Sequence, residues 1–187
     1  SSSAIVAWRL TRRSLPPFAE PIPAWGAGLV EPIRVDTRDG EQLGAWLVPA
    51  PRPSAAVLVL HGSGGSRTAE SHFLRWLASE GTTVLAPSLR AHGDSTGEKN
   101  DFGWGAREDV IACVSLLESR APAIPIVVVG ESLGAVAAIY AAGELGQRVP
   151  MACHKCLRAL LDEDATLAKQ VVVEDKIIDK LNRQLFD

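Results

Sequence analysis

The sequence predicts an α/β fold in which an antiparallel hairpin precedes a mostly parallel sheet. Short apolar runs carry this prediction at residues 55–60, 82–86 and 124–129, and each is followed by a segment with helical character. Such runs are typical of strands buried on both faces of a sheet. Strands that alternate with helices form βαβ units, whose strands run parallel. The 187 residues suffice for one domain with a sizeable core.

The hairpin is expected before the first buried strand. Residues 14–32 contain five Pro and two Gly without a steady period, which predicts an extended surface segment. Residues 33–37 then alternate in polarity, Asp39-Gly40 is a turn signal, and residues 43–48 continue as a second strand.

Three helices are expected between and after the buried strands. Their segments are residues 69–80, 106–119 and 133–142, of which the last is rich in small apolar residues that allow close packing on a sheet. In parallel sheets the loops at the carboxyl ends of the strands build the site. The loops after Leu60, Ala86 and Val129 are therefore the places to look for chemistry.

Composition excludes several classes of protein. A net charge of −3 gives no general reason to bind nucleic acid. Three cysteines form no disulfide framework, which favours a reducing compartment such as the cytoplasm. No run of about 18 apolar residues is present. The apolar residues 4–8, followed by arginines, leave two interpretations open: the end of a membrane anchor that lies upstream, or a frayed terminus.

The composition changes near residue 150. All 16 Gly lie at or before Gly146 and all 12 Pro at or before Pro150. We therefore expect an extended segment at 1–29, an α/β domain at 30–149 and a helical tail at 150–187.

The loop after the third buried strand carries a candidate nucleophile. It contains Gly130-Glu131-Ser132-Leu133-Gly134 between a strand and a helix. A serine on a sharp strand-to-helix turn needs small neighbours, because the backbone is strained and the next helix approaches closely. This pattern favours Ser132 as a nucleophile, with an ordinary tight turn and a helix-capping serine as the alternative.

The loop after the first buried strand is a candidate oxyanion hole. It contains His61-Gly62-Ser63-Gly64-Gly65, and such a turn leaves backbone N–H groups free. We expect the N–H groups of Ser63 and Leu133 to hold an oxyanion. A phosphate-binding loop is the rival interpretation, but no lysine follows at the required spacing.

Three further polar residues are expected at the edge of this site: His61, His92 and Glu131. His61 suits a structural role better than that of a base, because it lies beside the turn. His92 belongs to the sequence Arg90-Ala91-His92-Gly93-Asp94, which favours a hydrogen-bonded structural turn.

The three loops together resemble the α/β-hydrolase superfamily, and in particular its esterase, lipase and serine-aminopeptidase-like branch. The resemblance covers about residues 30–149. It implies the three-layer α/β-hydrolase sandwich and acyl transfer from a small-molecule ester, amide or similar substrate, without a metal or organic cofactor. It also implies that Ser132 is the nucleophile and that Ser63 and Leu133 form the oxyanion hole.

The acid and the base of a catalytic triad are missing from the expected places. In this family both follow the nucleophile, and the one later histidine is His154, which no recognisable strand precedes. An exposed helical histidine is the preferred interpretation of His154. The domain is therefore expected to be incomplete, with an open sheet edge that a partner chain could cover.

The tail has a helical pattern and resembles one helical hairpin of a PhoU-type phosphate-uptake regulator. Asp175 and Asp179 match that family's acidic motif and are weak candidates for a cation site, with a solvated acidic stripe as the alternative. Cys153 and Cys156 form a C-x-x-C without a second pair, and Cys113 is expected on a buried helix face, so we interpret the pair as coincidence.

The sequence thus leads to one functional hypothesis with two alternatives. The hypothesis is a serine hydrolase impaired by an incomplete triad. The alternatives are an inactive remnant, and a fusion whose helical tail acts as a regulatory, metal-binding or partner-binding module.

Overall fold

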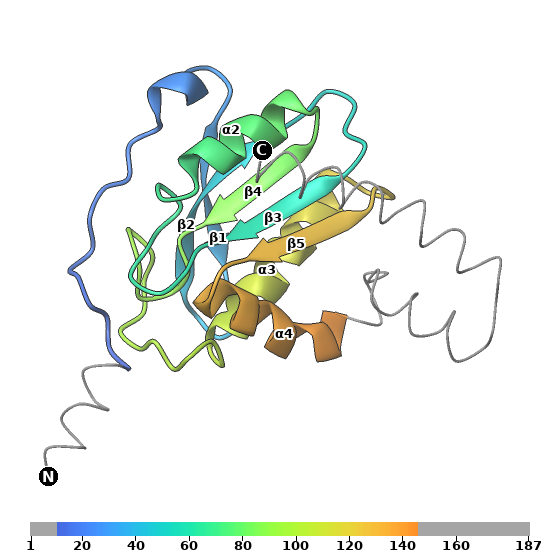
Figure 1. The fold of residues 1–187 in the computed structure, drawn as a ribbon. Helices are drawn as coiled ribbons and strands as arrows, with labels where there is room; N and C mark the ends of the chain where they lie inside the picture. The colour runs from blue at the N-terminus through green and yellow to red at the C-terminus, as the bar shows by residue number, and fades with distance from the viewer. Residues whose placement is uncertain (1–10, 146–187) are drawn as a thin grey trace, which may run out of the picture. The chain divides into compact units, whose positions relative to one another are not determined.

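The computed structural model describes residues 11–145, which form a five-stranded mixed sheet with helices on both faces (Figure 1). The elements in chain order are η1 (Ala24–Gly26), β1 (Glu31–Asp36), β2 (Gln42–Val48), β3 (Ala56–Leu60), α2 (Ser71–Ser79), β4 (Thr83–Pro87), α3 (Ala106–Arg120), β5 (Ile126–Gly130) and α4 (Leu133–Leu145). The predicted tail helices, the boundary near residue 150 and the residues Cys153, His154, Cys156, Asp175 and Asp179 lie outside the described residues.

The strands are ordered β1-β2-β4-β3-β5. β1 pairs with β2, and β2 with β4, in antiparallel fashion, whereas β3 is parallel to both β4 and β5. This arrangement confirms the predicted α/β class with an antiparallel hairpin at one edge of a parallel sheet. It also brings the ends of β3, β4 and β5 to the same edge, where the three glycine-containing loops begin.

The hairpin turn follows from its glycine. Gly40 has a φ of +96°, a left-handed conformation that glycine adopts without steric cost. The Thr37 N–H donates to the Glu41 carbonyl at 2.8 Å and closes the turn. The turn signal at Asp39-Gly40 is therefore confirmed.

The core lies on both sides of the central strands. Every residue of β3 and β4 is buried, because each strand has a partner on both sides and a helix layer on both faces. Figure 1 shows α2 on one face of the sheet and α3 on the other. On the α2 face the core comprises Val30, Trp46, Val48, Val57, Val59, Leu74, Leu77, Val84 and Ala86.

The third predicted strand is less buried than expected. Val127 and Val129 of β5 are 37% and 38% exposed. β5 is the outer strand of the sheet in the part of the chain that the structure describes, so it is paired on one side only. A continuous apolar run could not distinguish this position from a central one, because both positions favour the same residues.

The prediction of an extended surface segment at residues 14–32 is partly wrong. The segment contains the short helix η1, and Glu20, Gly26 and Val30 are buried. The charged Glu20 is buried because it pairs with Arg67, with 2.9 Å between its Oε2 and Arg67 Nη1.

None of the helices within residues 11–145 combines the length and the apolar character that crossing a membrane requires.

Candidate active site

Ser132 lies on a sharp turn between a strand and a helix. Only Glu131 and Ser132 separate the end of β5 from the start of α4. The Ser132 backbone has a φ of +46°, a left-handed conformation that is strained for a residue with a side chain. The residue is exposed, so the turn presents its hydroxyl to solvent.

The glycines that flank Ser132 are required by close contacts. A Cβ at Gly130 would lie 2.6 Å from the Ala135 nitrogen, and a Cβ at Gly134 would lie 2.6 Å from both the Cβ and the carbonyl oxygen of Leu60. Side chains cannot occupy these positions without moving the backbone. The glycine spacing that pointed to Ser132 is therefore a packing requirement of the turn.

The glycine-rich turn after β3 lies directly beside Ser132. A Cβ at Gly62 would lie 3.6 Å from the Cβ of Ser132, and the Glu131 N–H donates to the Leu60 carbonyl at 3.0 Å. Within residues 11–145, the N–H groups of Ser63 and Leu133 donate no hydrogen bond. The structure thus brings together two of the three predicted loops, each with an N–H group available to a ligand.

His61 is buried beneath this turn and is held as a neutral imidazole. Its Nδ1–H donates to the Gly62 carbonyl at 2.7 Å, and its Nε2 accepts the Leu89 N–H at 2.9 Å. Burial lowers the pKa of His61 to about 4. The ring therefore joins the first loop to the second, which is the structural role expected for it.

His92 is held in the same way. Its Nδ1–H donates to the Arg90 carbonyl at 2.9 Å, and its Nε2 accepts the Gly64 N–H at 3.2 Å. Burial lowers its pKa as well. The two imidazoles meet edge to face, with 5.0 Å between their centroids.

These hydrogen bonds determine what the two histidines can do. A general base needs a free lone pair to take the serine proton. The Nε2 lone pairs of His61 and His92 both accept backbone N–H groups. In the described part of the chain, no side chain is hydrogen-bonded to Ser132.

Glu131 belongs to the edge of the site. Its side chain is exposed, and its carboxyl carbon would lie 3.7 Å from a Cβ at Gly62. Burial raises the pKa of the nearby Glu70, and the negative charge of Glu131 raises it further. Glu131 therefore places a carboxyl group beside the turn that contains Gly62.

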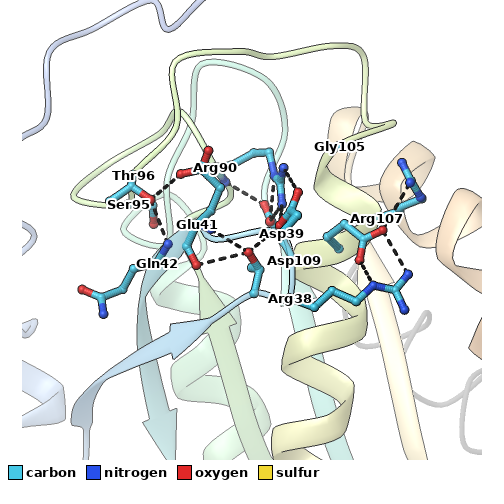
Figure 2. A network of polar contacts seen from close by, with 12 residues as sticks. Arg38, Asp39, Glu41, Gln42, Arg90, Ser95, Thr96, Gly105, Arg107 and Asp109 are labelled. Atoms are coloured by element: carbon cyan, nitrogen blue, oxygen red, sulfur yellow. Dashed lines mark hydrogen bonds and ion pairs between the residues drawn. The ribbon is translucent and has the colours of Figure 1, made fainter.

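A network around Arg90 fixes the second loop (Figure 2). The Arg90 guanidinium forms two hydrogen bonds to the Asp39 carboxylate, at 2.7 and 3.0 Å, and its Nε donates to Asp109 at 2.9 Å. The Arg90 backbone N–H also donates to Asp109, at 2.7 Å. The hydrogen bonds from Arg90 lower the pKa of Asp39 to about 2, and the network as a whole joins the hairpin turn to the first turn of α3.

Two residues near the site, Asn100 and Arg67, were not predicted from the sequence. The Asn100 side chain donates to the Ser63 hydroxyl at 3.2 Å. Arg67 is buried and pairs with Glu20 and with Asp94, at 2.9 and 2.7 Å. A buried arginine directly after a glycine-rich loop is a weak signal that a nearby acid is also buried, whereas nothing in the sequence around Asn100 marks it.

No metal site is formed by the described residues, since no three His, Cys, Asp or Glu side chains group as ligands there. Cys113 is fully buried on α3, as predicted, and burial raises the pKa of its thiol.

Comparison with known proteins points to one family. A model of the alpha/beta hydrolase family matches residues 57–179, more than half of the chain. A monoglyceride lipase homolog of monkeypox virus is 34% identical over 97 residues, which cover 50% of this chain and 35% of that protein. The human monoglyceride lipase is 31% identical over 99 residues, which cover 51% of this chain and 32% of the lipase.

Solved structures agree on the architecture. An esterase of Pyrococcus furiosus has a TM-score of 0.62 and 29% identity, over 70% of this chain and 50% of the esterase. A serine hydrolase of Xanthomonas campestris, described as lacking a lid, has a TM-score of 0.55 and 24% identity over 68% of this chain and 60% of that one, and supports the fold alone.

The matches span about a third of the two lipases and half of the archaeal esterase. The family model matches most of the described fold, and the order of the strands and the position of the Gly130–Gly134 turn agree with it. The chain belongs to the alpha/beta hydrolase family.

Proposed function

We propose that this chain carries the nucleophile and the oxyanion hole of a serine hydrolase that acts on carboxylic esters. The observation that carries the proposal is the left-handed backbone of Ser132, exposed at the end of β5 beside the glycine-rich turn. Strain of this kind is costly and persists where the surrounding structure enforces it, as at a nucleophile elbow.

The chemistry follows from the positions of the groups. The Ser132 hydroxyl attacks the ester carbonyl carbon and loses its proton to a base. The N–H groups of Ser63 and Leu133 stabilise the oxyanion, which then collapses to an acyl-serine as the C–O bond of the ester breaks and the base returns its proton to the departing alcohol. Water hydrolyses the acyl-serine by the same route. The base must come from outside residues 11–145, from His154, a further segment or a partner chain.

The substrate class is supported by the relatives. The two curated proteins are named as monoglyceride lipases and the archaeal structure as an esterase. All three names denote cleavage of a carboxylic ester. The exposed Glu131 next to Ser132 favours an uncharged ester over an anionic one.

A fluorophosphonate probe tests the proposal, because it reacts with an activated serine beside a formed oxyanion hole. Intact-mass spectrometry of the whole chain should show one adduct, and Ser132→Ala should abolish it. Ser119→Ala, which alters an exposed serine of α3, is a matched control and should retain the labelling. An unlabelled parent chain with a folded circular dichroism spectrum would contradict the proposal.

An alternative function has one observation in its favour. The Nε2 atoms of His61 and His92 both accept backbone N–H groups, and their Nδ1–H groups donate to backbone carbonyls, so neither ring can serve as the base. A chain without another base would retain the nucleophile turn as architecture only. The probe experiment separates the two cases, since an inactive remnant forms no adduct.

A further inference from the structure

We propose that His92 and Asn100 are positioning residues that hold the turn at residues 62–65 in place beside Ser132. The proposal rests on the proposed function, because the turn contains the Ser63 N–H that would bind the oxyanion. Neither residue touches the reacting atoms, and each acts through a hydrogen bond to the turn.

The turn needs external support because little packs against it. Gly64 has a φ of +76°, and a Cβ there would meet nothing within 4 Å. Ser63 and Gly64 are exposed. Within the turn a single bond is formed between described residues, from the Gly65 N–H to the Gly62 carbonyl at 3.1 Å. The remaining bonds that restrain its tip come from His92 and Asn100.

His92 is a rigid acceptor for the Gly64 N–H. Its ring is buried, and its other nitrogen donates to the Arg90 carbonyl, which fixes both the orientation of the ring and the position of its proton. The His61 ring packs against it in an edge-to-face arrangement. The acceptor therefore stays aimed at Gly64 without rearrangement, and the N–H of the preceding residue is that of Ser63.

Asn100 supports the turn from a second direction. Its side-chain amide donates to the Ser63 hydroxyl at 3.2 Å, while its backbone N–H donates to the Thr11 carbonyl at 2.9 Å. Together, His92 and Asn100 bond to two successive residues at the tip of the turn.

The loop at residues 88–100, which carries both residues, is itself held by the N-terminal segment. Arg13 donates to the carbonyls of Gly97 and Gly93, at 3.0 and 3.3 Å, and also to that of Ser95. The buried Glu20 carboxylate accepts the Ser88 hydroxyl at 2.6 Å. Residues 11–20 are thus a brace that fixes the loop, and through it the turn.

Replacing His92 tests this role. His92→Leu removes the acceptor, whereas His92→Gln places Oε1 the same number of bonds from the backbone as Nε2. We expect hydrogen exchange at the Gly64 amide to accelerate about tenfold in His92→Leu and to recover in His92→Gln. Labelling of Ser132 by the fluorophosphonate should slow by about tenfold in His92→Leu and should recover in His92→Gln.

Replacing Asn100 provides a second, independent test of the positioning role, which is needed if His92→Leu does not fold. Asn100→Ala should accelerate exchange at the Gly64 amide and slow labelling, with Lys99→Ala at the exposed neighbouring residue as control. In the background of Ser63→Ala, which lacks the hydroxyl acceptor, Asn100→Ala should have no further effect. Equal effects of Asn100→Ala in both backgrounds would overturn the role of this bond.

The two proposals fail in different ways. Absence of labelling in the parent chain contradicts the hydrolase function, while amide exchange at Gly64 still decides whether His92 holds the turn. Normal labelling together with unchanged exchange in His92→Leu and Asn100→Ala overturns the positioning role and leaves the hydrolase function intact.

Discussion

At the scale of single residues, α4 contains one glycine near its start and one near its end, and only the first is closely packed. A Cβ at Gly134 would lie 2.6 Å from Leu60, whereas one at Gly143 would meet nothing within 4 Å. The first glycine lets α4 start directly against β3. The second only lowers the helical propensity of the segment.

We predict opposite effects of alanine at these two positions. Gly134→Ala should destabilise the fold by about 1–3 kcal/mol, because the helix must move away from Leu60. Gly143→Ala should stabilise it by up to about 1 kcal/mol through helix propensity. Urea denaturation followed by circular dichroism measures both, and equal effects of the two variants would show that the contact with Leu60 is unimportant.

His61 makes the stability of the chain depend on pH. Its pKa is lowered by burial from 6.5 to about 4. Between these values the unfolded chain binds a proton that the folded chain does not. The stability that neutral, buried His61 provides is therefore retained above pH 6.5 and is lost as the pH falls toward 4. Burial raises the pKa of Asp109 from 3.8 to about 6, so between these values the folded chain binds a proton that the unfolded chain does not. Asp109 therefore makes the free energy of unfolding rise as the pH falls, which is opposite to the effect of His61.

The variant His61→Gln separates the effect of His61 on the pH dependence of stability from that of Asp109. The free energy of unfolding should fall between pH 7 and pH 5 by about 2 kcal/mol more in the parent chain than in His61→Gln. Urea titrations at both pH values give the difference. His72→Gln, which alters an exposed histidine of α2, should retain the parent's pH dependence. An equal fall in the parent and in His61→Gln would argue against a neutral, buried imidazole.

At the scale of elements, Arg90 joins parts of the chain that local structure does not connect. Its partners are Asp39 in the hairpin turn and Asp109 in the first turn of α3. The Asp109 carboxylate is fully buried, and its position near the helix N-terminus adds a favourable interaction with the helix dipole. The network therefore sets where α3 begins relative to the sheet.

Breaking this buried pair should be costly. Asp109→Asn leaves Arg90 partly uncompensated and should destabilise the chain by about 3–5 kcal/mol. Arg34→Gln removes an exposed ion pair with Asp94 and should cost at most about 1 kcal/mol. Thermal unfolding of the two variants compares them, and similar losses would mean that the Arg90 network contributes no more than a surface pair.

At the scale of the whole molecule, β5 differs from the other parallel strands. β3 lies between β4 and β5, whereas β5 has a single partner strand within residues 11–145. Strand edges expose unpaired N–H and C=O groups, and Val127 and Val129 are more than a third exposed. The sheet therefore has an apolar edge next to the candidate nucleophile.

Hydrogen exchange of the full chain can show whether this edge is open. Amides of β3 should all be protected, whereas alternate amides of β5 should exchange at least about tenfold faster, because their N–H groups point away from β3. Mass spectrometry with fragment resolution, or NMR, reads both strands in one sample. Uniform protection along β5 would show that a further strand or a partner chain pairs with it.

Much of the fold could be predicted because its signals are local. The apolar runs at β3 and β4 and the glycine spacing around Ser132 each depend on residues close together in sequence. Chain topology then places the ends of the parallel strands at one edge, so the proximity of the two glycine-containing loops also followed from the sequence.

The burial of Glu20 could not be predicted in this way. Its partner Ser88 is 68 residues distant, and a carboxylate in a proline-rich segment is normally exposed. The same limit applies to Asn100, whose bond to Ser63 spans 37 residues. Neither contact has a periodic signal, because it depends on how separate loops fold over the sheet edge.

The sequence by itself determined the α/β class and the order of the elements, and it led to the proposal of Ser132 as the nucleophile. Only the tertiary structure decided that the Nε2 atoms of His61 and His92 accept backbone N–H groups, and that the N-terminal segment braces the loop that carries His92. The physical reason is that periodicity and glycine spacing report local backbone needs, whereas hydrogen-bond partners and buried charges are set by contacts between distant segments.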